Sequence, residues 1–120
     1  MNFEANDMKV LGAIVGGGKT FKNITVTTRL DKDEQEKILG FLDQSKLITA
    51  TEGTSFFGQA KFYFAATDEG TKKVHEYIEE LKGEWKKIIQ FVTDGQREEL
   101  DEYMKQNKFL VNMMLFFKII

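Results

Sequence analysis

The chain has 120 residues and a formal net charge of -2, with 42% hydrophobic and 30% charged residues. This length holds one hydrophobic core and is too short for most two-domain enzymes. The sequence has no cysteine, which excludes disulfides and thiolate metal sites, and its single histidine, His75, does not build a histidine-rich metal site. The acidic balance gives no overall basic footprint, so any nucleic-acid contact must be local.

The N-terminal segment does not resemble a signal peptide. Residues 1–9 carry Glu4 and Asp7 and have no basic region before an apolar stretch. No apolar run is long enough to span a bilayer. We therefore expect a cytoplasmic protein with no membrane association and no cofactor.

The first predicted helix covers Ala5–Val15, with Asn6 or Asp7 as its N-cap. Three consecutive glycines, 16–18, end it. The next stretch, Thr20–Leu30, is rich in β-branched residues, and its pattern fits either a short helix or a strand.

A second clear helix is predicted over Asp31–Ser45, with Asp31 or Asp33 as its cap. Its buried face carries Ile38, Leu39 and Leu42. Two strand-like runs follow, Leu47–Glu52 and Ala60–Ala66, joined by a seven-residue tip; they predict a hairpin.

A long helix is predicted from Thr67 or Asp68 to about Val92, with an apolar stripe close to a heptad pattern. Thr93 is the expected cap of a final helix that continues through Phe117. The tail, Phe109–Ile120, is almost wholly apolar, so it must pack on the domain or on a partner.

This order of elements is that of a winged helix followed by a helical extension. Three stretches resemble MarR-like transcriptional regulators. In Leu30–Ile48, the residues Leu39, Leu42, Leu47 and Ile48 are in the register of a helix that enters the first wing strand. Phe62–Gly70 resembles the second wing strand entering a helix, and Val92–Leu100 resembles the start of the next helix. The resemblance implies an α+β, mostly helical fold: a three-helix core, a two- or three-stranded wing and a C-terminal helical extension. It implies a winged-helix domain at 1–70, a helical dimerisation extension at 71–120, and a homodimeric regulator that binds double-stranded DNA.

The expected recognition helix begins with an unusually acidic segment. Asp31, Asp33, Glu34 and Glu36 would face phosphates, and like charges at close range repel. A solvated face with Asp33–Lys37 pairing is the plainer interpretation of these charges. The residues expected to contact DNA are Thr27, Thr28, Arg29, Lys32, Lys37 and Lys61. The alternative function is a protein-interaction module that does not bind DNA and uses the acidic helix together with Phe56 and Phe57 at the hairpin tip.

The apolar helical faces of the last third predict a homodimer. The residues expected at its interface are Trp85, Ile89, Leu110, Met114 and Phe117.

A glycine-rich segment, Ala13–Thr20, matches a relaxed phosphate-binding loop, in which Lys19 would contact phosphate and Thr20 magnesium. Such a loop must follow a strand and precede a helix, so nucleotide binding is a remote alternative to a plain helix end and turn. No catalytic triad, metal motif or acid–base pair is evident, and we expect no enzyme.

Overall fold

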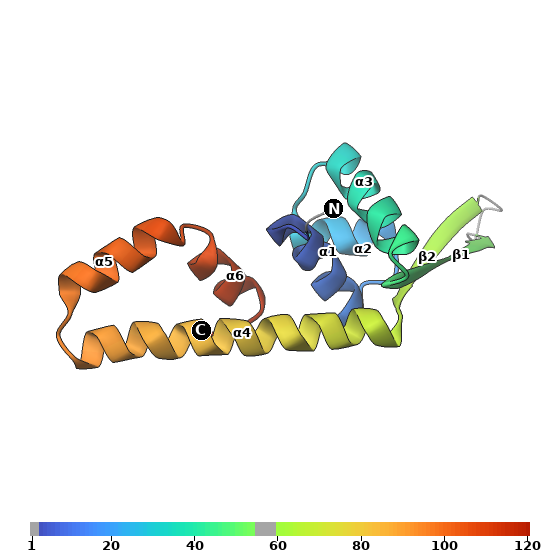
Figure 1. Cartoon of the computed structure of the whole chain (residues 1–120). Coiled ribbons are helices and arrows are strands. Elements are labelled where there is room, and N and C mark those ends of the chain that lie inside the picture. The colour runs from blue at the N-terminus through green and yellow to red at the C-terminus, as the bar shows by residue number, and fades with distance from the viewer. Residues whose placement is uncertain (1–2, 55–59) are drawn as a thin grey trace. The chain divides into compact units, whose positions relative to one another are not determined.

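The structure, a computed structural model, describes residues 3–54 and 60–120 (Figure 1). Its elements in chain order are α1 (Ala5–Val15), α2 (Phe21–Thr28), α3 (Lys32–Gln44), β1 (Ile48–Thr54), β2 (Ala60–Ala66), α4 (Asp68–Thr93), α5 (Arg97–Gln106) and α6 (Leu110–Phe116). The chain forms two compact units, Met1–Val74 and His75–Ile120. The first holds α1, α2 and α3, a two-stranded antiparallel sheet and the start of α4, which is the mostly helical winged-helix architecture that the sequence predicted.

Helix α1 has the predicted bounds but a different cap. Its N-cap is Glu4, not Asn6 or Asp7. The backbone N–H of Glu4 donates to Oδ2 of Asp7 at 2.8 Å, and the Glu4 side chain accepts from the backbone of Asp7 in return. Asp7 thus serves as the third residue of a reciprocal capping box, an arrangement usually built from other residue types.

The ambiguous stretch after the glycines is a helix. Thr20 caps α2, because its hydroxyl accepts a hydrogen bond from the backbone N–H of Asn23. Arg29 ends the helix with a left-handed φ of 58°. Asp31 then caps α3 as predicted, its carboxylate accepting from the backbone N–H of Asp33.

The wing is the antiparallel pair β1–β2, in which Ile48 lies opposite Ala66 and Ala50 opposite Phe64. The preceding loop joins its edge, since the backbone N–H of Phe64 donates to the carbonyl oxygen of Lys19 at 2.8 Å. Phe56 and Phe57, expected at the tip, lie outside the described residues.

The base of the wing is tied to α4 through Thr67. Its hydroxyl donates to the carbonyl oxygen of Lys46 at 2.8 Å and accepts from the backbone N–H of Gly70 at 3.1 Å. Gly70 is buried, and a Cβ at this position would collide with the carbonyl oxygen of Leu47. The start of α4 therefore lies directly against the turn that begins β1.

The apolar core of this first unit is formed by buried side chains of α1, α2, α3, β1 and the start of α4. They are Met8, Val10, Leu11, Ala13, Ile14, Ile24, Ile38, Leu39, Leu42, Ile48 and Val74. The three residues predicted for the buried face of α3 are all among them.

In the second unit α4 ends later than predicted and Thr93 is its last residue, so Thr93 does not cap the next helix. Gly95, with φ of 69°, donates to the carbonyl oxygen of Val92, and Gln96 donates to that of Phe91. These two bonds form a Schellman motif, in which glycine supplies the left-handed residue. Helix α5 starts at Arg97, and its N-cap is Gln96.

The single final helix predicted through Phe117 is two helices, separated at Asn107–Phe109. The side-chain amide of Asn107 donates to the carbonyl oxygen of Tyr103 and competes with helix continuation there. Two ring contacts join the returning chain to α4: Phe91 with Tyr103, at 5.6 Å between centroids, and Tyr77 with Phe117, at 5.5 Å.

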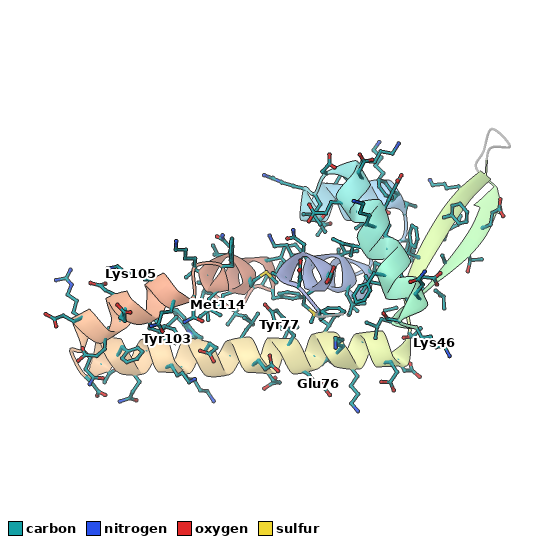
Figure 2. The ribbon with its side chains drawn as sticks, turned by 45° about the horizontal axis from the view of Figure 1, so that its top comes forward. Lys46, Glu76, Tyr77, Tyr103, Lys105 and Met114 are labelled. Carbon is teal, nitrogen blue, oxygen red and sulfur yellow. The ribbon has the colours of Figure 1, made fainter. Side chains whose placement is uncertain are left out.

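Figure 2 shows Tyr77 on the side of α4 that faces the returning helices and Glu76 on the opposite side. Among the described residues, no helix is long and apolar enough to cross a membrane.

Candidate nucleic-acid interface

A buried glutamine joins the two helices of the helix-turn-helix. The side chain of Gln35 is fully buried. Its amide nitrogen donates to Oγ1 of Thr25 at 2.9 Å and to the carbonyl oxygen of Phe21 at 3.1 Å, and its oxygen accepts from the hydroxyl of Thr28 at 3.0 Å. Because every polar atom of the amide has a partner, burial does not leave it unsatisfied. This network fixes α3 against α2.

Sequence reasoning missed Gln35, although a signal was present. Gln35 lies three, four and seven residues before Ile38, Leu39 and Leu42, so it shares their helix face. A glutamine in register with an apolar stripe, one helix after two threonines, indicates a buried polar link.

The opposite face of α3 is open. Its exposed residues are Asp33, Lys37, Gly40 and Gln44. Asp33 and Lys37 form no ion pair, contrary to the pairing expected from their spacing; ion pairs among the described residues include Lys82–Glu79 and Lys87–Glu84 on α4. Asn6 holds Glu34 by a hydrogen bond of 2.7 Å between Nδ2 and Oε1.

Most of the expected DNA-contacting side chains lie on the surface of the helix-turn-helix. Arg29, Lys32 and Lys37 are exposed, as is Thr27, whose hydroxyl donates to the carbonyl oxygen of Asn23 at 3.1 Å and retains its lone pairs. Thr28 is different, because it is buried and its hydroxyl is held between Gln35 and the backbone N–H of Leu30. Its hydroxyl positions α3 and is not open to a ligand.

Lys61, the expected contact on the wing, is exposed on β2. Its ammonium lies 5.8 Å from the ring centroid of Tyr63, within the range of a cation–π contact. Lys61 and Tyr63 therefore share one face of the strand, and Phe62 and Phe64 share the other.

The residues expected at a dimer interface all lie in the second unit. Trp85, Leu110 and Phe117 are half-buried, Ile89 is exposed and Met114 is buried. Phe117 contacts Tyr77 and Phe116 by edge-on ring packing. The exposed large apolar residues of this unit are Ile89, Val92, Phe109, Leu115 and Ile120.

Two half-buried tyrosines of this unit have hydroxyl groups in unusual surroundings. Burial, with a smaller contribution from Glu80, raises the pKa of Tyr77 above its usual 10.0. The hydroxyl of Tyr103 is buried without a hydrogen-bond partner among the described residues.

The phosphate-loop interpretation is wrong. A phosphate-binding loop must follow a strand, but residues 13–15 belong to α1. The hydroxyl of Thr20, expected on magnesium, caps α2. Within the described part of the chain no three His, Cys, Asp or Glu side chains are placed to hold a metal.

Solved transcriptional regulators have the same fold. The regulator BpsR of Bordetella bronchiseptica, whose DNA binding is regulated by 6-hydroxynicotinic acid, is 17% identical with a TM-score of 0.57; the alignment covers 89% of this chain and 65% of BpsR. A Lactococcus lactis ZitR variant is 13% identical, with a TM-score of 0.62 and coverage of 90% and 75%. ZitR is a zinc-responsive member of the MarR family.

MepR of Staphylococcus aureus, a regulator of the multidrug efflux pump MepA, is 18% identical, with a TM-score of 0.56 and coverage of 95% and 81%. The sequence matches no protein-family profile and no curated protein. The chain thus has the winged-helix fold of MarR-like regulators, at low sequence identity, and spans about two thirds of the length of BpsR.

Proposed function

We propose that this protein is a DNA-binding transcriptional regulator that acts as a homodimer. The observation that carries the proposal is the helix-turn-helix itself: Gln35 fixes α3 against α2, and the outer face of α3 is open. In this motif the second helix enters the major groove and the first crosses the backbone. Support comes from the three regulators with the same fold.

The proposed contacts are Thr27, Arg29, Lys32, Lys37 and Lys61, all exposed. The cations among them would neutralise phosphates, while Thr27 is suited to a phosphate hydrogen bond. Thr28 is left out of the contact set because it is buried. Acidic side chains on α3 oppose this charge, so we expect weaker binding than a basic recognition helix would give.

A low-salt anisotropy titration against mixed duplex DNA tests the proposal. Arg29→Gln and Lys37→Gln should each weaken binding, since each removes one phosphate contact per protomer. Lys86→Gln, an exposed lysine on α4, is the matched control and should bind as the parent protein does. A flat titration of the parent protein would refute DNA binding.

We further propose that residues 1–70 form the winged-helix domain and 71–120 the dimerisation extension. The exposed apolar residues of the second unit would be covered by the same residues of a second copy, as in a two-fold interface. Ile89 and Leu110 are the proposed central contacts.

A second candidate function is a protein-interaction module, and the acidic α3 favours it. Replacing Asp33, Glu34 and Glu36 by lysine separates the two. DNA affinity should rise if α3 meets DNA, whereas binding to a basic protein partner should be lost under the second function.

A further inference from the structure

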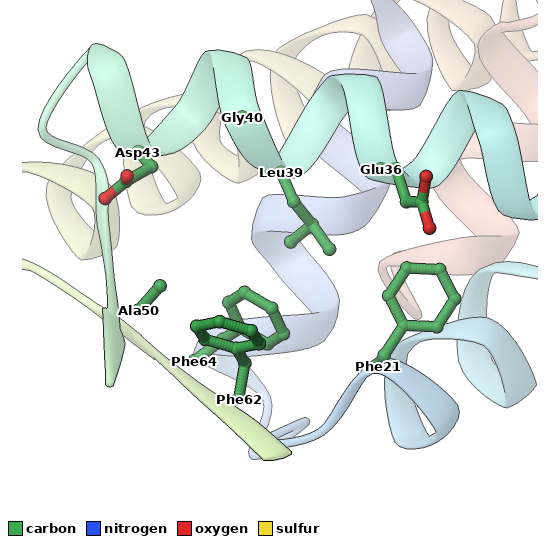
Figure 3. A pocket seen from close by; sticks show the side chains of 8 residues that line it. All are labelled: Phe21, Glu36, Leu39, Gly40, Asp43, Ala50, Phe62 and Phe64. Carbon is green, nitrogen blue, oxygen red and sulfur yellow. The ribbon is translucent and has the colours of Figure 1, made fainter. Parts of the chain in front are cut away.

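One hollow in the first unit is not used by the proposed function. It lies between α3 and the β1–β2 hairpin, with Phe21 of α2 at one end (Figure 3), and has a volume of about 300 Å³. Its lining residues are Phe21, Glu36, Leu39, Gly40, Asp43, Ala50, Phe62 and Phe64. This volume lies at the lower end of the range for small-molecule sites.

Small residues keep the hollow open. Gly40 lies between Glu36 and Asp43 on the same side of α3, and a Cβ at Gly40 would meet no atom within 4 Å. A glycine inside a helix is less favourable than alanine, because it loses more backbone freedom on folding. Ala50 is the facing residue on β1. Because both residues are small, α3 and β1 leave space between them that larger side chains would fill.

The lining combines aromatic rings with negative charge. Three phenylalanines contribute, and Phe62 remains 53% exposed although it is large and apolar. Glu36 and Asp43 project from α3 at either end of Leu39 (Figure 3), and neither forms an ion pair within the described residues. Aromatic faces attract cations through the ring quadrupole, and carboxylates add charge complementarity.

The adjoining hollow carries the opposite charge and limits where a cation would lie. It shares Glu36 and three phenylalanines with the first and adds Thr20, Lys22, Lys32 and Lys61. The ammonium of Lys61 lies beside Tyr63, on the other face of β2 from Phe62. Lys22 and Lys32 are the remaining lysines of the adjoining hollow, and their charge favours placement of a cation at the Asp43 end.

We propose that this hollow binds a small organic cation, an amine or quaternary ammonium compound with an apolar body. The body packs on Phe62 and Phe64, and the charge lies near Asp43. The site accounts for two of the acidic side chains on α3 that DNA recognition does not explain. Cation binding at this site does not require DNA, so the experiment that tests it contains none.

The test is a titration of the ¹⁵N-labelled full chain with benzyltrimethylammonium, followed by NMR. Benzyl alcohol serves as the neutral analogue and benzenesulfonate as the anionic one, all at one ionic strength. The cation should shift the amide signals of Gly40, Ala50 and Phe62 in a saturable way. The two analogues should bind at least about fivefold more weakly.

Matched variants identify the charge responsible. Asp43→Asn should weaken cation binding by about three- to fivefold and Glu36→Gln by less, while Asp33→Asn removes the same charge from α3 outside the hollow and should change nothing. Phe62→Ala should weaken binding, and Tyr63→Ala, on the other face of β2, should not.

Three results would overturn the proposal. One is the absence of a saturable shift at Gly40 and Ala50. Another is binding of benzenesulfonate as tight as that of the cation, which would assign binding to the lysines of the adjoining hollow. The last is an equal loss of affinity in Asp33→Asn and Asp43→Asn, which would show a general effect of charge.

Discussion

The hydroxyl of Thr28 on α2 donates a 3.0 Å hydrogen bond to Oε1 of Gln35 on α3, and both side chains are buried. Gln35 makes two further hydrogen bonds, to Thr25 and to the backbone of Phe21. The orientation of the expected recognition helix therefore depends on a polar contact inside the fold.

Gln35→Ala should lower the free energy of unfolding by about 2–4 kcal/mol, because it leaves a cavity and removes a partner from two threonine hydroxyls. Gln44→Ala, at the exposed end of the same helix, should stay within about 0.5 kcal/mol of the parent protein. Urea unfolding measures both. Equal effects of the two substitutions would remove Gln35 from its linking role.

Two glycines of α4 should respond to alanine in opposite directions. Gly70→Ala should destabilise the protein by about 2 kcal/mol or more, since its Cβ meets the carbonyl oxygen of Leu47. Gly83→Ala meets nothing within 4 Å and should stabilise by about 0.5–1 kcal/mol through helix propensity. Thermal unfolding of the pair checks this, and stabilisation by Gly70→Ala would contradict the close approach of α4 to the wing.

Apolar periodicity was enough to predict α1, α3, α4 and the hairpin, but it left α2 open between a helix and a strand. Leu39 and Leu42 repeat at helical spacing and are buried, while Phe62 and Phe64 alternate with Tyr63 as a strand requires. Such local patterns predict helices and strands because the residues that form the pattern are the ones that form the core.

Contacts between distant residues were not predictable in the same way. The helix face that Gln35 occupies could be read from its spacing to Leu39 and Leu42, but its hydrogen-bond partners, ten and fourteen residues away, could not. Thr93 looked like a cap, but Gly95 sets the helix end through its left-handed backbone. The hollow beside Gly40 depends on a strand that lies opposite it only after folding.

Stability should fall at alkaline pH through Tyr77. Its pKa is raised in the folded state, so the folded protein holds this proton more tightly than the unfolded chain. The contribution is complete below pH 10.0, the usual value, and is lost as pH rises through the folded-state pKa. Tyr77→Phe should reduce the alkaline loss of the free energy of unfolding, measured by urea unfolding. Tyr63→Phe, on the exposed wing, should leave this loss unchanged. An unchanged pH dependence in Tyr77→Phe would contradict the role of Tyr77.

The proposed dimer should depend on exposed apolar residues of the second unit. Phe109 is 72% exposed, so Phe109→Ser does not disturb a core and neither should Ile89→Lys. Both should shift sedimentation at micromolar concentration from dimer to monomer, because they leave polar groups in an apolar interface. Val26→Ser, an exposed apolar residue of α2, is the control. A parent protein that sediments as a monomer would refute the dimer.

DNA binding through the proposed cations predicts a specific dependence of DNA affinity on salt. Each protomer offers four cations, Arg29, Lys32, Lys37 and Lys61, and each phosphate contact contributes about 0.9 to the slope of log K against log salt. For a dimer in which most of these contacts form, we predict a slope of about -4 to -7 in anisotropy titrations between roughly 50 and 200 mM salt. No binding at the lowest salt, or affinity that does not change with salt, would contradict a DNA-binding role for this winged helix.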